Sequence, residues 1–332
     1  MNRKNFIVGM NIHNKGYAAY PEENFERNLD YCEQMGINLV NFNCTLGDND
    51  ADNRLAYIKS VADAVHRRGM KFCLCVDDRT CFDRKLEEIE ERDYENQKKI
   101  CEYLKGSVDI YEVGPEFDVP AMHTDMGDIY NIIGDQFDGM VPEEYDPVRL
   151  AKTAPSVRGR LRAIREIDPD VKTMVAFAWW HTYYVEFLRN NGCEWDIMGV
   201  DWYSDAEKAS SFLDLLDWIK DHFGDIPVLI CETNFWGYNY KDKTPEEGDA
   251  EQAEWVCRFC EHIINDTPER CLGLVYYELM DEPSFDEENG GFHGEAHFGF
   301  VKCNKDGSNP VPKPSVKALG ETVEKLMKKL GR

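Results

Sequence analysis

The chain has 332 residues and a formal net charge of −25 at pH 7, because 63 Asp and Glu residues outnumber 38 Lys and Arg residues. This acidity excludes a nucleic-acid-binding protein, which needs a basic surface, and argues against association with anionic membranes. Hydrophobic residues make up 42% of the chain, which supplies a large core and excludes a disordered protein. No apolar run reaches the length of about 18 residues that a membrane span requires.

Twelve cysteines are spread along the chain, and several lie inside apolar runs, as Cys73 and Cys75 do. This pattern is typical of buried, reduced thiols rather than of a disulfide framework. The first residues also lack the apolar segment of a signal peptide. The sequence therefore predicts a cytoplasmic protein.

Short apolar segments rich in Val, Ile and aromatic residues predict strands that are covered on both faces. In chain order these segments are 6–13, 37–43, 71–78, 108–116, 172–181, 196–204, 226–233 and 271–279. Amphipathic segments between them predict helices over 22–35, 53–68, 84–105, 148–166, 209–222, 247–265 and 314–330. Gly36 and Gly69 follow the first two of these helices, as glycines at helix ends do.

Eight strands that alternate with helices favour an α/β protein in which residues 1–332 form a single (β/α)8 TIM barrel as one domain. An open, doubly wound sheet is the alternative, but no GxGxxG motif follows the first strand. Two segments, 117–147 after the fourth strand and 280–313 after the eighth, are predicted to be long loops. Both belong at the carboxyl end of the barrel, where binding loops lie.

Two glutamates stand at the ends of strongly apolar strands, Glu116 after the fourth and Glu232 in the seventh. An ionisable group is costly in such surroundings unless it has a role. Two carboxyl groups that meet across a barrel mouth can cleave a glycosidic bond: one protonates the leaving oxygen, and the other attacks the anomeric carbon or activates water. The sequence therefore predicts a glycoside hydrolase.

Four motifs extend this interpretation, namely YEVGPEFD, GVDWYS, VLICETNFW and VYYELMDEP. Together they resemble the clan A retaining β-glycoside hydrolases, in the style of the cellulase-like and galactanase-like branches. The resemblance implies Glu116 as acid/base and Glu232 as nucleophile, with Tyr203 in contact with the nucleophile. It also implies cleavage of β-glycosidic bonds with retention, through a glycosyl–enzyme intermediate.

Two positions depart from the clan pattern. Pro115 stands where the clan usually has an Asn whose amide contacts the sugar 2-hydroxyl, and the second strand ends without the clan's Arg. Arg79, after the third strand, is a candidate replacement for that Arg. The missing amide suggests a sugar with an axial 2-hydroxyl, such as a β-mannoside.

Further polar and aromatic residues at strand ends are predicted to bind the oligosaccharide or glycoside substrate, since flat aromatic faces suit sugar rings. They are Asn11, His13, Asp77, Trp179, Trp180, His181, Trp202, Tyr203, Trp236, Tyr277 and Glu278. No cofactor and no metal are predicted. The run HGEAH holds His293 and His297, but its glycines disfavour the helix that an HxxxH metal site needs.

Two other functions stay open. A metal-dependent TIM-barrel isomerase or hydrolase would use acids at the strand ends together with His181, and a chelator would abolish its activity. A non-catalytic carbohydrate-binding barrel would keep the aromatic residues and bind sugar without turnover.

Overall fold

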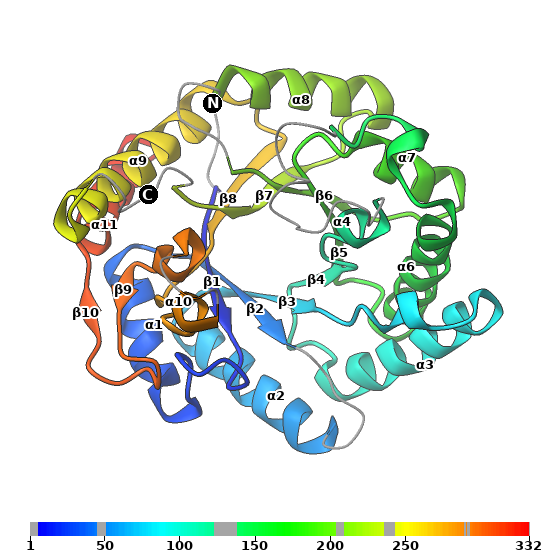
Figure 1. Ribbon diagram of the computed structural model, residues 1–332, viewed down its shortest axis with the longest axis horizontal. Helices are drawn as coiled ribbons and strands as arrows, with labels where there is room; N and C mark the ends of the chain where they lie inside the picture. The colour runs from blue at the N-terminus through cyan, green and yellow to red at the C-terminus, as the bar shows by residue number, and fades with distance from the viewer. Residues whose placement is uncertain are drawn as a thin grey trace. The chain divides into compact units, whose positions relative to one another are not determined.

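The computed structural model describes residues 6–44, 51–122, 138–203, 209–235, 243–288, 290 and 293–331. Eight parallel strands close into a barrel in chain order, which confirms the predicted (β/α)8 TIM barrel (Figure 1). The strands are β1 Ile7–His13, β2 Leu39–Cys44, β3 Lys71–Val76, β4 Ile110–Val113, β5 Lys172–Ala178, β6 Ile197–Asp201, β7 Val228–Thr233 and β8 Cys271–Tyr276. All seven residues of β1 are buried, as the lack of alternation in its sequence predicts.

Every predicted helix has an observed counterpart. The α-helices are α1 Phe25–Gln34, α2 Ala51–Arg67, α3 Leu86–Leu104, α4 Asp118–Ala121, α6 Pro147–Ile167, α7 Thr182–Asn190, α8 Ala209–Phe223, α9 Pro245–Asp266, α10 Ser284–Glu288 and α11 Pro314–Lys329. Helix α7 is missing from the sequence prediction, because its nine residues are few and rich in aromatic and β-branched side chains. The segment 280–313 contains α10 and an antiparallel pair, β9 Val301–Lys302 with β10 Val311–Pro312.

Side-chain caps mark where two of the longer helices begin. Asp146 accepts hydrogen bonds from the backbone N–H groups of Val148 and Arg149 at the start of α6. Thr244 and Glu247 form a capping box at the start of α9. Such caps satisfy N–H groups that have no partner within the helix, so they fix the residues at which α6 and α9 begin.

The strand predicted over 108–116 is shorter in the structure and ends at Val113. Gly114 has φ +66° and Glu116 has φ +44°, so the backbone leaves the extended conformation directly after β4. For a residue with a Cβ atom the left-handed region is uncommon and carries strain. The turn after β4 is therefore a specialised one that holds Glu116 in a fixed position.

The chain divides into two compact units. The first comprises Met1–Asn43, Ala64–Lys71 and Tyr203–Arg332, and the second comprises Cys44–Asp63 and Phe72–Trp202. Within the first unit α9 packs along α11, and within the second α3 packs along α6 (Figure 1). That residues 1–332 form one domain stays a prediction.

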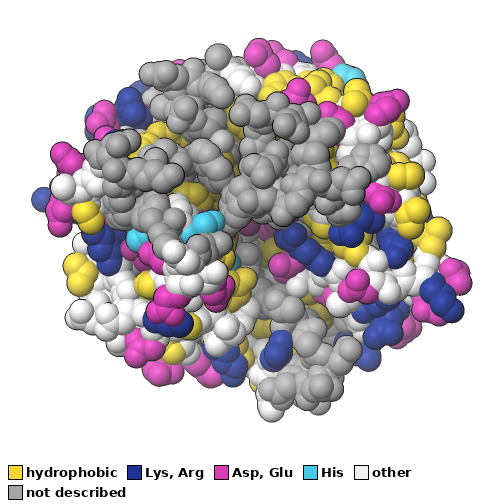
Figure 2. Space-filling model, in the orientation of Figure 1, with side chains coloured by type: hydrophobic (Ala, Val, Ile, Leu, Met, Phe, Trp, Pro, Cys, Tyr) yellow, Lys and Arg dark blue, Asp and Glu magenta, His cyan; other side chains and the backbone are white. Residues whose placement is uncertain are grey.

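The surface visible in Figure 2 carries the many charged side chains that the composition predicts, and the described cysteines are free thiols as expected. Acidic side chains are spread among basic ones over the visible face in Figure 2. The eleven cysteines whose side chains are described are free thiols, and most are buried. None of the helices in the described ranges combines the length and the apolar character that crossing a bilayer requires.

Candidate active site

Glu232 is the one residue of β7 that is not fully buried. The Tyr203 hydroxyl donates a hydrogen bond of 3.1 Å to Glu232 Oε2. The Tyr203 ring in turn stacks on Phe298, with ring centroids 5.8 Å apart and planes at 19°. A hydroxyl donor of this kind favours the ionised carboxylate that a nucleophile must be. The contact between Tyr203 and Glu232 that the resemblance implied is present.

Two side chains that sequence reasoning missed hold the Phe298 segment. Asn234, buried directly after β7, donates to the carbonyl oxygen of Phe298 over 2.7 Å and also to that of Tyr277. Gln252, from α9, donates to the same Phe298 oxygen over 2.9 Å. These bonds fix the ring on which Tyr203 stacks. In the sequence, the one signal for the role of Asn234 in holding this segment is its position directly after a predicted strand.

Glu116 lies in the second unit, in the left-handed conformation described above. Arg79 Nη2 is 3.9 Å from Glu116 Oε2, and a carboxylate oxygen of Asp201 lies within 4.8 Å of one of Glu116. Glu116 therefore lies near both a positive and a negative group. Backbone strain of this kind clusters at functional sites, so the φ value of Glu116 independently marks it as a functional candidate.

Arg79 is oriented by Asp77, whose Oδ1 accepts a hydrogen bond of 3.0 Å from Arg79 Nε. Burial lowers the pKa of Arg79, but the negative charges of Asp77 and Glu116 raise it by more than burial lowers it. The net shift of the pKa is therefore upward. The guanidinium thus stays protonated and lies beside Glu116 in the turn after β4. Asp77 thus orients Arg79, and its predicted contact with substrate stays a prediction.

The tryptophans after β5 and β6 lie together in the second unit. Trp179 stacks on Trp202, with ring centroids 4.3 Å apart and planes at 18°. Trp202 is fully buried, whereas Trp179 and Trp180 are half-buried. Trp179 has φ +49°, a second strained backbone position at a strand end. Trp236 lies outside the described residues.

His181 precedes α7 and is fully buried. Its Nδ1 contacts Asp118 Oδ2, and the same oxygen accepts a hydrogen bond of 2.9 Å from the backbone N–H of Ala178. Asp118, which the sequence did not single out, therefore fixes the orientation of the imidazole. The predicted substrate contact of His181 stays a prediction.

In the first unit, His13 and Glu278 meet at the ends of the neighbouring strands β1 and β8. His13 Nε2 is 3.2 Å from Glu278 Oε2, and the Tyr20 hydroxyl donates to that oxygen over 2.6 Å. Burial raises the pKa of Glu278 well above its usual value, although the Tyr20 hydrogen bond lowers it. Burial and the charge of Glu278 raise the pKa of Glu282 to about 9. Two side chains predicted to bind substrate, His13 and Glu278, thus contact each other away from solvent.

Asn11 lies in β1, two residues before His13. Tyr277 directly follows β8 and precedes Glu278. The Asn11 amide is buried, and none of the described residues forms a hydrogen bond with it. The Tyr277 ring is half-buried and meets His13 edge to face at 5.3 Å. Their predicted contacts with substrate stay predictions.

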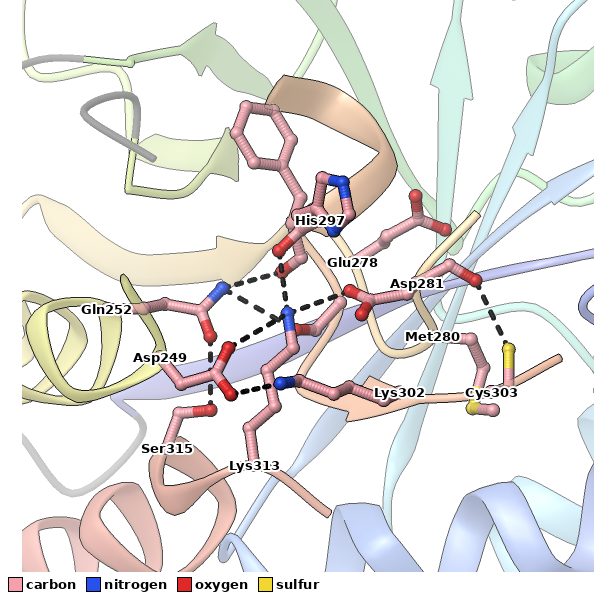
Figure 3. Close-up of polar contacts among 12 residues, drawn as sticks. Asp249, Gln252, Glu278, Met280, Asp281, His297, Lys302, Cys303, Lys313 and Ser315 are labelled. Atoms are coloured by element: carbon pink, nitrogen blue, oxygen red, sulfur yellow. Dashed lines mark hydrogen bonds and ion pairs between the residues drawn. The ribbon is translucent and has the colours of Figure 1, made fainter. Parts of the chain in front are cut away.

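A buried lysine ties the segment after β8 to the start of α11 (Figure 3). Lys313 Nζ lies 2.8 Å from Asp281 Oδ1 and 3.9 Å from Asp249 Oδ1, and it donates to the carbonyl oxygen of His297 over 2.7 Å. Burial raises the pKa of Asp281 to about 6, although Lys313 lowers it. Lys302 also contacts Asp249, so two cations balance two buried carboxylates.

We expect Lys313→Met to lower the free energy of unfolding by about 3–5 kcal/mol, because it leaves Asp281 as a buried charge without its cation. Urea unfolding measures this change. Lys317→Met is the matched control, since Lys317 is largely exposed and pairs with exposed Glu321, where a change of about 0.5 kcal/mol is expected. Equal effects of the two substitutions would contradict this account.

A groove of about 960 Å³ lies between α1 and α11 in the first unit. Gly36, Val316 and Gly320 are among its lining residues. Gly36 follows α1 and directly precedes the segment that leads into the amino end of β2, whereas the candidate residues of the first unit lie at or after the carboxyl ends of strands. Its size alone does not make it the active site.

The comparisons with known proteins bear on the fold. No protein-family model and no curated protein matches the sequence. The structure matches a β-glucosidase from Thermotoga maritima with a TM-score of 0.69 at 13% identity, covering 97% of this chain and 98% of that one. It matches the GH53 catalytic domain from Ignisphaera aggregans with a TM-score of 0.64 at 14% identity, covering 95% and 96%.

A third match is the AHE enzyme from Alicyclobacillus herbarius, with a TM-score of 0.66 at 10% identity, covering 98% of this chain and 97% of that one. Identities this low establish likeness of fold alone. The resemblance seen in the motifs and the likeness seen in the structure lead to the same group of proteins: the chain has the (β/α)8-barrel fold of a β-glucosidase and of a GH53 catalytic domain.

Proposed function

We propose that this protein hydrolyses β-glycosidic bonds of oligosaccharides with retention, with Glu232 as nucleophile and Glu116 as acid/base. The observation that carries the proposal is the 3.1 Å hydrogen bond from Tyr203 to Glu232 at the end of β7. The left-handed backbone of Glu116 after β4 supports it. Fold neighbours that include a β-glucosidase support it as well.

In the proposed mechanism Glu232 attacks the anomeric carbon while Glu116 gives its proton to the leaving oxygen. The resulting glycosyl ester is cleaved by water, from which Glu116 takes a proton, so both side chains return to their starting states. The carboxyl ends of the strands in a parallel barrel face one end of the barrel. On that ground we expect the two carboxyl groups about 5–5.5 Å apart, the separation that retention requires.

We propose that half-buried aromatic rings hold the sugar. Trp179 and Trp180 after β5 and Tyr203 after β6 keep part of their surface accessible. The free thiols fit a cytoplasmic location, so an oligosaccharide imported into the cell is the proposed substrate rather than an insoluble polymer.

A panel of aryl β-glycosides with gluco, galacto and manno configuration tests this function. Proton NMR during hydrolysis reports the anomer that forms first, and the β-anomer is expected. First formation of the α-anomer would mean inversion, and absence of turnover on every substrate would favour a non-catalytic binding barrel. Preference for the manno substrate would fit Pro115, whereas preference for gluco or galacto would reject the axial 2-hydroxyl.

Tyr203→Phe tests the contact with the nucleophile. Loss of a hydrogen bond to a charged group costs about 1.5–3 kcal/mol, so we expect kcat/KM to fall about 10- to 100-fold, with the fold unchanged. Tyr103→Phe removes the same hydroxyl from an exposed ring on α3 and is the control. If both variants keep full activity, Tyr203 does not support a nucleophile.

A further inference from the structure

Three side chains from the two ends of the chain converge within the first unit. His13 is the last residue of β1, and Glu278 and Glu282 follow β8. Strands β1 and β8 are paired in parallel, with Met10 opposite Tyr276, so their carboxyl ends lie side by side. One potential ligand atom from each of the three side chains lies within 4.8 Å of the other two. The exposed fractions are 1%, 0% and 3%.

Each of the two carboxyl groups of this cluster has one oxygen atom without a hydrogen-bond partner among the described residues. Glu278 Oε1 and Glu282 Oε1 are buried, and neither forms a hydrogen bond with any of the described residues. The neighbouring cation, Lys313, is engaged by Asp281 and Asp249, and Figure 3 draws no contact between it and Glu278. Burial of a carboxylate without a bonded partner is strongly unfavourable. Glu278 Oε1 and Glu282 Oε1 therefore leave two acceptor positions beside the imidazole that a positive ligand can fill.

The residues around the cluster hold it in place. Tyr20 donates to Glu278 Oε2 over 2.6 Å and accepts a hydrogen bond of 2.9 Å from the backbone N–H of Met280. The His13 ring stacks on Tyr17 at 4.0 Å, and Tyr20 packs against its edge. Metal-binding sites commonly have such outer partners, which orient each ligand before the ion binds.

We propose that His13, Glu278 and Glu282 bind one divalent transition-metal ion of the Zn²⁺ or Mn²⁺ type. One imidazole nitrogen with two carboxylate oxygens is a ligand set that suits these ions. Binding displaces the protons that the raised pKa values of Glu278 and Glu282 favour, and the resulting charge of −2 beside a neutral imidazole is neutralised by the divalent cation. Water completes the coordination. The ion joins β1 to the segment after β8. It uses neither Glu116 nor Glu232, but it takes two side chains that the sequence predicts to bind substrate, His13 and Glu278.

The test is metal binding to the full-length protein, first stripped with a chelator and then dialysed. Isothermal titration with ZnCl2 and with MnCl2 is expected to give one equivalent bound by the unmodified protein. Glu282→Gln keeps the shape of the side chain but removes a charged ligand, so we expect at least about tenfold weaker binding. Glu288→Gln is the matched control, because Glu288 is exposed, and it is expected to bind as tightly as the unmodified protein.

Thermal unfolding gives a second readout, because an ion that binds only the folded state raises the melting temperature. We expect the ion to stabilise the unmodified protein and Glu288→Gln, but not Glu282→Gln. Absence of a stoichiometric ion in the unmodified protein would overturn the proposal, and so would equal affinity of the two variants. Glu278→Gln replaces Glu282→Gln in the same comparison if the latter does not fold.

Discussion

Glu232→Ala is expected to lower kcat for an aryl β-glycoside on the order of 10⁴- to 10⁶-fold, because removal of a nucleophile stops formation of the covalent intermediate. The melting temperature should change little, since Glu232 is half-buried and the rest of β7 is fully packed. Steady-state kinetics and thermal unfolding on the same preparation separate the two effects. Glu254→Ala, on the exposed face of α9, is the control.

Azide sharpens the test of Glu232. The alanine side chain leaves room for azide on the face from which the carboxylate attacked. One displacement from that face inverts the anomeric carbon, so the rescued product should be the α-glycosyl azide. Full activity of Glu232→Ala without azide would contradict its assignment as nucleophile, as would rescue that gives only the β-azide.

Glu116→Gln is expected to lower kcat/KM about 10²- to 10⁴-fold for substrates with a poor leaving group, the range of general acid catalysis. An activated aryl leaving group needs little protonation, so the loss on such a substrate should be much smaller. The difference between the two substrate classes identifies a proton donor, because a misfolded variant would lose activity on both. Glu143→Gln, at an exposed position between β4 and α6, is the control.

The pH profile provides a second signature of Glu116. In the unmodified protein kcat/KM should fall at the alkaline end of the profile as the acid loses its proton. That limb should disappear in Glu116→Gln, whose amide does not titrate. A limb that persists in the variant would assign the proton donor to another group.

The barrel itself could be predicted from the sequence, because apolar segments and helix-ending glycines report on local structure. Residues near strand ends were also recognisable: Glu232 lies in the last part of β7, whereas Glu116 lies in the turn after β4 rather than at the end of the strand. The predicted ends of strands were less accurate where the apolar segment of the sequence extends beyond the residues that pair in the sheet. After β4 only the backbone angles of Gly114 and Glu116 show where the strand stops.

Contacts between distant segments could not be predicted in the same way. Asp118 was not singled out because nothing in FDVP indicates that it will meet His181 in the core. The closed barrel predicts that β8 pairs with β1, but the proximity of Glu282 to His13 depends on the course of the backbone after β8, which the order of the strands does not fix. Short helices such as α7 are missed for a different reason, because nine residues are too few to show a helical periodicity of apolar residues.

The position of Lys313 has a practical consequence for shortened or tagged versions of the protein. Lys313 immediately precedes α11, and its ammonium group neutralises Asp281 from a segment more than thirty positions earlier in the chain. A C-terminal truncation that removes residue 313 would therefore damage the rim of the barrel as well as the final helix. Gly331, after α11, is exposed, so a fusion partner joined there would leave this ion pair intact.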